Sequence, residues 1–158
     1  METLVVGYGN TLRRDDGAGI AAARAIARAF PGVHVLTAHG LNPEIAEDIA
    51  RCDLAVFIDA SVANAKVCVT KLSPSGMPDE GHALSPSGVL ALASGAYGRV
   101  PGEALLVEIP AFECGFGETM SGGTLRMIDC CVQLVSELLR GETTPEILMC
   151  LAPSPAAD

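Results

Sequence analysis

Residues 4–30 decide the fold, and they read LVVGYGNTLRRDDGAGIAAARAIARAF. The first apolar run ends at Gly7, a polar loop follows, and from Gly17 to Phe30 apolar residues recur at helical spacing. We therefore expect a buried strand, a loop and a helix in that order. Asp16 is placed to cap this helix, and Pro31 follows its expected end.

The rest of the chain continues this alternation of strands and helices. Further strands are predicted at residues 33–37, 54–58, 66–72 and 104–109, and further helices at 44–51, 85–95 and 124–140. Apolar strands that alternate with helices are typical of a parallel sheet covered on both faces. The predicted fold class is therefore α/β, a three-layer, mostly parallel twisted sheet with helices on both faces.

The chain of 158 residues has the usual length of one domain. We assign residues 1–141 to a single α/β domain. Residues 142–158 contain three prolines and little periodicity, so we expect a C-terminal tail that is partly disordered. Within that tail, residues 147–149 are apolar and could pack locally.

Composition limits the partners that the protein can have. The formal net charge is −9 and no run of Lys or Arg occurs, which argues against nucleic acid or an anionic membrane surface as a partner. No stretch approaches the ~18 apolar residues that a transmembrane helix needs. The first strand follows the N-terminus without a basic leader or cleavage site. We expect a cytoplasmic protein that is a monomer.

The loop after the first strand is similar to a dinucleotide-binding fingerprint, but it departs from it in two ways. Gly7 and Gly9 are present, whereas the position of the third glycine is Leu12. Asp15 and Asp16 lie where a helix N-terminus would otherwise bind a pyrophosphate, and they would repel it. A cation or a polarised water is therefore a better ligand, and a nucleotide-binding enzyme is the weaker interpretation.

Two aspartates follow strands that we expect to be neighbours. Asp16 comes after the first strand and Asp59 ends the third, and ligands of such sheets bind beyond the carboxyl ends of the strands. The two carboxylates could share a metal or a water. A helix cap for Asp16 and a strand-end turn for Asp59 are the structural alternatives. His82, in the loop before Ser85, could reach the same edge or could simply be solvated. Two carboxylates and an imidazole would suit nickel or zinc.

Residues 7–19, GYGNTLRRDDGAG, resemble the signature of the hydrogenase maturation endopeptidases, G-x-G-N-x-L-x-x-D-[DE]-G-x-G. Asp59 in the segment FIDA and His82 in the segment HALSP resemble the two later motifs of that family, in the same order. The resemblance covers roughly residues 3 to 140.

The resemblance implies an endopeptidase that removes a C-terminal extension from the nickel-loaded precursor of a nickel-iron hydrogenase large subunit. It implies that Asp16, Asp59 and His82 bind nickel that arrives in the substrate, with no metal bound permanently. We expect Gly9, Asn10 and His39 to contact the substrate. For His39, which lies in a His-containing variant of a family loop, a local hydrogen bond is the alternative.

Two mechanisms and one rival function are compatible with the sequence. Nickel held by the three ligands could polarise the scissile carbonyl or a water, with a carboxylate as general base. Alternatively, Asp16 and Asp59 could act on one water as in aspartic peptidases, with nickel used for recognition only. The rival is a non-enzymatic nickel-binding chaperone of the immature subunit. The cysteines match no catalytic pattern of the family, so we do not expect a cysteine nucleophile.

Overall fold

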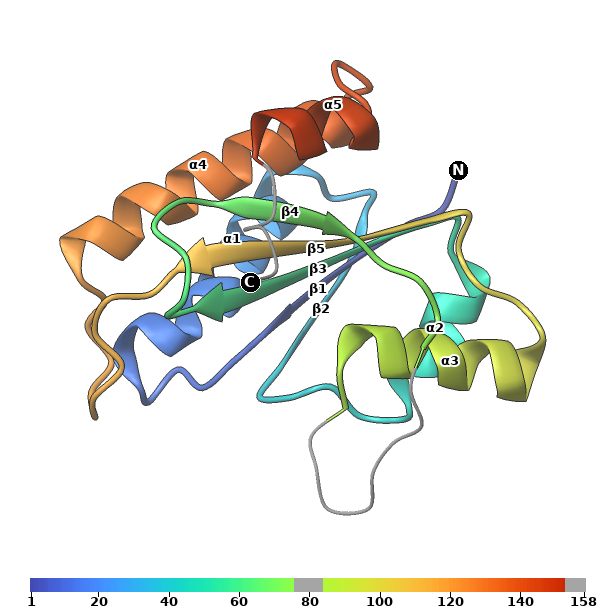
Figure 1. The fold of residues 1–158 in the computed structure, drawn as a ribbon, viewed down its shortest axis with the longest axis horizontal. Helices are drawn as coiled ribbons and strands as arrows, with labels where there is room; N and C mark the ends of the chain where they lie inside the picture. Colours follow the sequence, from blue (N-terminus) through green and yellow to red (C-terminus); the bar gives the residue numbers. More distant parts are fainter. Residues whose placement is uncertain (76–83, 153–158) are drawn as a thin grey trace.

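The computed structural model describes residues 1–75 and 84–152 (Figure 1). The strands are β1 (Thr3–Tyr8), β2 (His34–Ala38), β3 (Leu54–Ser61), β4 (Cys68–Lys71) and β5 (Glu103–Pro110). The α-helices are α1 (Ala18–Ala29), α2 (Ile45–Arg51), α3 (Pro86–Tyr97), α4 (Gly122–Leu139) and α5 (Pro145–Leu151), and a 3-10 helix, η1 (Arg14–Gly17), precedes α1.

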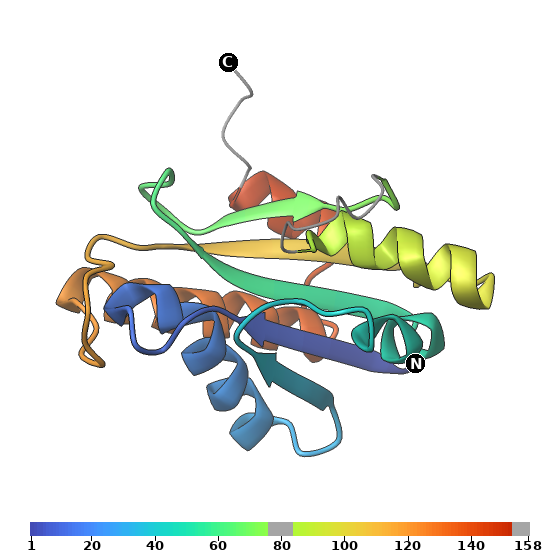
Figure 2. The ribbon, with the colours of Figure 1, turned by 90° about the horizontal axis from the view of Figure 1, so that it is seen from below.

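The strands form one mostly parallel sheet in the order β2-β1-β3-β5-β4. Only β4 is antiparallel to its neighbour, β5, and Figure 2 shows β2 and β4 at the two edges. Figure 1 shows α4 and α5 on one side of the sheet and α2 and α3 on the other, and α1 shares the core of α4 and α5. The predicted three-layer α/β fold is confirmed.

The two faces of the sheet carry separate hydrophobic cores. Val5 and Ile58 point into the core that α1, α4 and α5 cover, whereas Val6 and Phe57 point into the core beneath α2 and α3. Neighbouring residues of a strand face opposite sides, so a central strand buried on both sides is apolar throughout. Burial of each such side chain contributes about 1.5–3 kcal/mol.

A close contact at Gly19 fixes where α1 begins. A Cβ atom at Gly19 would lie 2.3 Å from the carbonyl oxygen of Ile58 and 2.7 Å from that of Tyr8. Only a glycine allows the helix to rest on the ends of β1 and β3 at this distance. The turn that carries Asp16 is thereby placed at the carboxyl edge of the sheet.

Three elements differ most from the sequence predictions, and one of them is η1, a 3-10 helix at Arg14–Gly17 where a loop is expected. The third strand continues to Ser61 instead of ending at residue 58, because β5 pairs with it as far as the Ser61 and Pro110 pair. The sequence predicted no helix after residue 141, yet α5 forms with Thr144 as its N-cap. Local packing of residues 147–149 is confirmed, because Leu148 of α5 is buried in the core. The expected partial disorder of the tail, residues 142–158, stays a prediction, because residues 153–158 lie outside the described residues.

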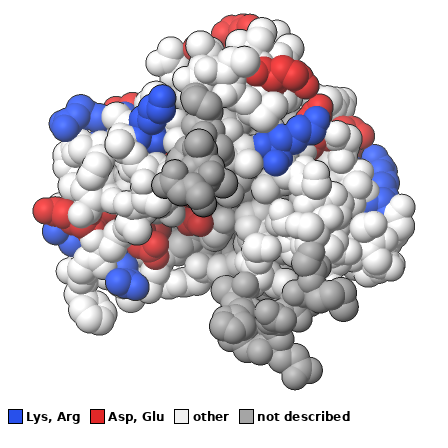
Figure 3. Space-filling model, viewed as in Figure 1, with Lys and Arg blue, Asp and Glu red and all other residues white. Residues whose placement is uncertain are grey.

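The surface carries charges of both signs. On the face shown in Figure 3, Lys and Arg side chains are interspersed with Asp and Glu, although the net charge of the chain is −9. Within residues 1–75 and 84–152, no helix is long and apolar enough to cross a bilayer.

Candidate active site

The candidate site lies at the carboxyl ends of β1 and β3, which are hydrogen-bonded neighbours in the sheet. Gly7 of β1 pairs with Ile58 of β3, and Asp59 is the next residue along β3. The turn η1, which carries Asp16, follows β1 and contacts β3. The predicted adjacency of the first and third strands is confirmed, and it brings Asp16 and Asp59 to the same edge.

Asp16 is held by the loop that precedes it. Its Oδ2 atom accepts a hydrogen bond from the Asn10 amide at 2.9 Å. The predicted cap of the helix by Asp16 is wrong, because η1 runs directly into α1 and Gly17 stands at the N-cap without any side-chain bond. The carboxylate therefore turns back toward the loop, half-buried, instead of serving the helix.

Gly9 makes this arrangement of the loop possible. Its φ angle is +143°, and a Cβ atom here would lie 2.1 Å from the carbonyl oxygen of Asp16. Both facts exclude any other residue without a shift of the backbone. The Gly9 amide also donates to the Ala38 carbonyl oxygen at 3.1 Å, which ties the loop to the end of β2.

Asp59 is half-buried and its acidity is changed by its surroundings. Its Oδ1 atom accepts a hydrogen bond from the Ala60 amide at 2.8 Å, and the Tyr8 hydroxyl donates a second hydrogen bond to the carboxylate. Burial raises the pKa of Asp59 to about 6, and repulsion by Asp16 and Glu108 acts in the same direction. The two hydrogen bonds oppose this rise without cancelling it.

Tyr8 responds to the same negative charges. Burial raises the pKa of the Tyr8 hydroxyl, and the charges of Asp59 and Glu108 raise it further. The hydroxyl therefore stays protonated at neutral pH and acts toward Asp59 as a hydrogen-bond donor. Asp59 itself can gain or lose a proton near neutral pH, as a general acid or base must.

The structure says less about the other predicted site residues. Gly9 and Asn10 form the loop beside Asp16, and His39 is exposed immediately after β2, at the same edge of the sheet. Their contact with a substrate stays a prediction. His82 lies outside the described residues. Among the residues that the structure does describe, no three His, Cys, Asp or Glu side chains converge closely enough to hold a metal ion.

The sequence assigns no role to Tyr8 or Glu108, and it treats Asp15 only as a charge that would repel a pyrophosphate, whereas the structure shows the Asp15 carboxylate buried and bonded within the protein. Glu108 could have been found from its position, because it is a charged residue inside the otherwise apolar run ALLVEIP of β5. Tyr8 ends β1 directly before the loop of the site. The burial of Asp15 gave no such signal, since the residues that bond its carboxylate lie about a hundred positions away in the chain.

Cys114 is the cysteine next to the two aspartates of η1. Burial raises the pKa of its thiol, and the negative charges of Asp16 and Asp15 act in the same direction, against a smaller effect of Arg13. A thiol held in its protonated form is a poor nucleophile. Cys114 is therefore not favoured as a nucleophile.

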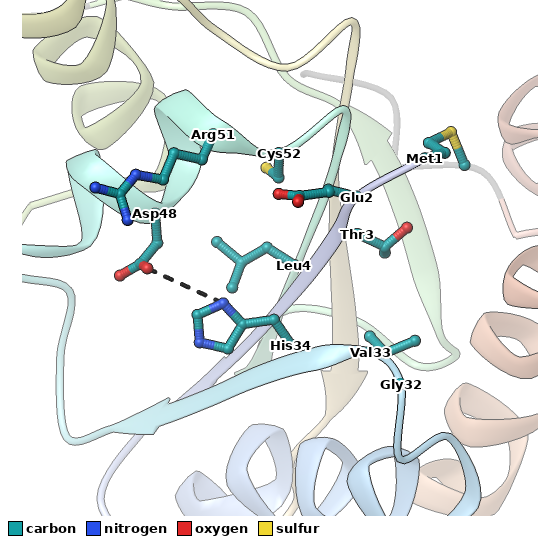
Figure 4. Close-up of a pocket in the computed structure, with 10 residues that line it drawn as sticks. All are labelled: Met1, Glu2, Thr3, Leu4, Gly32, Val33, His34, Asp48, Arg51 and Cys52. Atoms are coloured by element: carbon teal, nitrogen blue, oxygen red, sulfur yellow. Dashed lines mark ion pairs between the residues drawn. The ribbon is translucent and has the colours of Figure 1, made fainter.

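A pocket of about 490 Å³ opens at the opposite edge of the sheet, at the start of β1 and β2 (Figure 4). Its lining includes His34 and Asp48, which form a loose ion pair with 4.0 Å between Nδ1 and Oδ1. Such an exposed pair contributes little to stability. The pocket is thus separate from Asp16 and Asp59, which lie at the carboxyl ends of the strands.

No model of a known protein family matches the chain, and no curated protein matches it either. Solved structures do match. An endopeptidase from Escherichia coli has a TM-score of 0.71 and 22% identity, over 91% of this chain and 95% of that one. The hydrogenase maturating endopeptidase HybD from E. coli has a TM-score of 0.70 and 21% identity, over 90% and 94%. The maturation protease HycI from Thermococcus kodakarensis KOD1 has a TM-score of 0.68 and 21% identity, over 88% and 92%.

The chain therefore has the fold of a group of α/β endopeptidases. Named members of that group are [NiFe] hydrogenase maturation proteases, and their fold spans nearly the whole of this chain. The fold implied by the signature in residues 7–19 is confirmed.

Proposed function

We propose that the protein is a hydrogenase maturation endopeptidase that removes the C-terminal extension of a nickel-loaded hydrogenase large-subunit precursor. The observation that carries the proposal is that Asp16, in the turn after β1, and Asp59, on the adjacent strand β3, lie at one edge of the sheet, in a fold shared with hydrogenase maturation proteases. Their mutual repulsion is relieved when a proton or a cation lies between them. Such a site suits both amide hydrolysis and a metal that arrives with the substrate.

Nickel enters this proposal as part of the substrate. Asp16 and Asp59 would supply carboxylate oxygens, and the sequence resemblance adds His82 as an imidazole ligand. This donor set is acceptable to nickel and leaves coordination positions for groups of the precursor. A precursor without nickel would lack this anchor and would be bound less well.

In the mechanism that uses nickel for recognition only, Asp59 is not bound to nickel during the reaction and is the better candidate for the general base, because its pKa of about 6 lies near neutral pH. In the proposed reaction, Asp59 takes a proton from a water while the oxygen of that water bonds to the scissile carbonyl carbon. The carbon–nitrogen bond then breaks, and Asp59 returns the proton to the leaving amine. Asp16, fixed by the Asn10 amide, orients the water or the substrate's nickel.

The test is to incubate the purified protein with nickel-loaded precursor and to measure the precursor's mass. We expect a loss of mass at its C-terminus with the wild type, and none with Asp16→Asn or Asp59→Asn. Asp129→Asn, on the exposed side of α4, is the matched control and should process normally.

Each alternative gives a different outcome. Binding of the precursor without cleavage would favour the nickel-binding chaperone. Normal processing by both site variants would refute the assignment of Asp16 and Asp59. Cleavage of nickel-free precursor at the same rate would remove nickel from the mechanism. A cytoplasmic location and a monomeric state stay predictions from the sequence.

A further inference from the structure

Asp15 precedes Asp16 in the chain, but its side chain is fully buried. Its carboxylate accepts four hydrogen bonds, all from the segment that links β5 to α4. Oδ1 accepts from the Ser121 amide at 2.7 Å, and Oδ2 accepts from the Ser121 hydroxyl at 2.7 Å. Oδ2 also accepts from the amides of Phe112 and Glu113, at 2.9 and 2.8 Å. Because a buried carboxylate without donors is costly, the folded turn requires this segment in place.

The backbones of the two segments are joined as well. The Asp15 amide donates to the Glu113 carbonyl oxygen at 3.0 Å, and the Arg14 amide donates to that of Gly117 at 2.9 Å. The Gly117 amide in turn donates to the Leu12 carbonyl oxygen at 2.9 Å. Three backbone hydrogen bonds, which include an isolated parallel β-bridge between Arg13 and Gly117, therefore join residues 12–15 to residues 113–117.

Both arginines of the first segment reach across to the second. Arg13 Nε donates to the Cys114 carbonyl oxygen at 3.2 Å, and Arg14 Nε donates to that of Thr119 at 2.8 Å. Arg14 Nη2 also pairs with Glu113 Oε2 at 2.6 Å. Both arginine side chains are therefore engaged in contacts within the protein, which leaves them less available to bind another molecule.

The turn is held in a backbone conformation that it would not adopt alone. Arg14 has a φ angle of +50°, and it is the one residue other than glycine with a positive φ in the described parts of the chain. Such a conformation costs free energy and persists only where surrounding contacts fix it. The bonds of Asp15, next in the chain, are contacts of that kind.

Ser121 extends the connection to the core of the fold. Its hydroxyl donates to Asp15 and also accepts from the Thr124 amide at 3.3 Å, which makes it the N-cap of α4. The buried Thr124 hydroxyl donates to the Pro110 carbonyl oxygen, at the end of β5, at 2.9 Å. Through Ser121, Asp15 thus fastens η1 to α4 and β5.

We infer that Asp15 is a positioning residue that holds η1 so that the Asp16 carboxylate stays bonded to the Asn10 amide, at the edge of the sheet where Asp59 lies. The Asp16 carboxylate is bonded to the amide of Asn10, which belongs to the same loop, so its direction is set by the turn that carries it. Asp15 touches no substrate in this scheme. The expected effect of Asp15 on cleavage rests on the proposed function. The expected effect of Asp15 on the turn rests on the structure alone.

Three variants test the inference. Asp15→Asn keeps the size of the side chain, but its amide NH₂ group would face the hydrogen-bond donors of Phe112, Glu113 and Ser121. Ser121→Ala removes one of the four bonds together with the cap of α4, and Ser121→Thr restores the hydroxyl. Thr144→Ala is the matched control, because Thr144 caps α5 with the same 3.3 Å bond, to the Ile147 amide, far from the site.

Two readouts are needed, both at a temperature where circular dichroism shows each variant to be folded. The first is kcat and KM for cleavage of nickel-loaded precursor. The second is hydrogen exchange of the Asn10 amide, which reports on the turn without any cleavage. For Asp15→Asn we expect kcat to fall by about tenfold to a hundredfold, with KM changed by less than about twofold, because a displaced catalytic group affects the reacting geometry. Exchange at Asn10 should become at least about tenfold faster.

The remaining variants decide between positioning and general stabilisation. We expect Ser121→Ala to show a smaller loss of kcat, Ser121→Thr to recover to within about twofold, and Thr144→Ala to leave both readouts unchanged. Unchanged kcat and exchange in folded Asp15→Asn would overturn the inference, as would an equal loss in Thr144→Ala. If Asp15→Asn does not fold, the Ser121 pair decides by the same criteria. If the wild type does not cleave, the proposed function fails, and exchange at Asn10 still decides the inference.

Discussion

Asp59 of β3 and Glu108 of β5 are paired residues in the parallel register of the sheet. Residues paired in this way direct their side chains to the same face, and both side chains are half-buried. After burial itself, the charges of Asp16 and Glu108 are the remaining causes that raise the pKa of Asp59 to about 6. Glu108 therefore influences the protonation of the candidate base from the neighbouring strand.

Glu108→Gln should lower the pKa of Asp59, because it removes one of the two repelling charges. The acid limb of the plot of kcat/KM against pH should move to lower pH, by less than about one unit, since burial remains the larger cause. Cleavage of nickel-loaded precursor from pH 5 to 8 measures the shift. Glu146→Gln, at an exposed position of α5, removes the same charge elsewhere and should leave the profile in place. A shift to higher pH would contradict the interpretation.

Tyr8→Phe should move the same profile in the opposite direction. The Tyr8 hydroxyl donates a hydrogen bond that stabilises the charged form of Asp59, so its loss should raise the pKa of Asp59 above about 6. The measurement is the pH dependence of cleavage, supported by the carboxyl chemical shift of Asp59. Tyr97→Phe, at the exposed end of α3, is the control and should have no effect. Equal shifts of the pH profile in Tyr8→Phe and Tyr97→Phe would show that the hydrogen bond from Tyr8 to Asp59 is not the cause.

Asp15 should make the fold sensitive to acid. Burial alone would raise the pKa of Asp15, but the hydrogen bonds from Ser121, Glu113 and Phe112 together hold it well below its usual range. In the unfolded chain Asp15 takes up a proton as the pH falls to about 4, whereas in the folded chain its carboxylate is still charged at that pH. The stability that Asp15 contributes is therefore complete above about pH 4, and it is lost as the pH falls through the lowered pKa that Asp15 has in the folded state.

Asp15→Asn should accordingly be less stable at pH 7 by about 2–4 kcal/mol, because buried donors lose a charged acceptor. Its free energy of unfolding should also fall less steeply below pH 4 than that of the wild type. Urea unfolding at several pH values between 7 and 3 measures both effects. Asp129→Asn provides the control for loss of an exposed aspartate. Parallel curves for wild type and Asp15→Asn would show that Asp15 is not the group responsible.

The fold could be predicted because its central strands are continuous apolar runs. Val5, Val6 and Phe57 lie on strands that are buried on both faces, and in a chain that alternates with helices such a run indicates a central parallel strand. The end of β3 could not be predicted, because its last residues, up to Ser61, are polar or half-buried and stay in the strand only through pairing with β5. Such long-range pairing leaves no local pattern.

The candidate site was predictable only in part, for a related reason. Asp16 and Asp59 follow apolar strands, so their shared edge could be inferred from topology. The different environments of Asp15 and Asp16 could not, because the two residues are chemically identical neighbours. Their separation depends on the β5–α4 segment, whose Ser121 lies more than a hundred positions away in the chain.

Gly19→Ala should destabilise the protein although alanine is the better helix former. The added Cβ atom would lie 2.3 Å from the Ile58 carbonyl oxygen, a backbone atom that cannot move without displacing β3. We expect a loss of about 1–3 kcal/mol or more, as for other overpacked sites, together with slower cleavage because Asp59 follows Ile58. Gly95→Ala is the matched control, since Gly95 lies in α3 with no atom within 4 Å of the position of its Cβ. That variant should be stabilised by about 0.4–1 kcal/mol. Thermal unfolding of both variants measures the contrast, and a Gly19→Ala protein as stable as Gly95→Ala would mean that α1 can move off the sheet without disturbing the site.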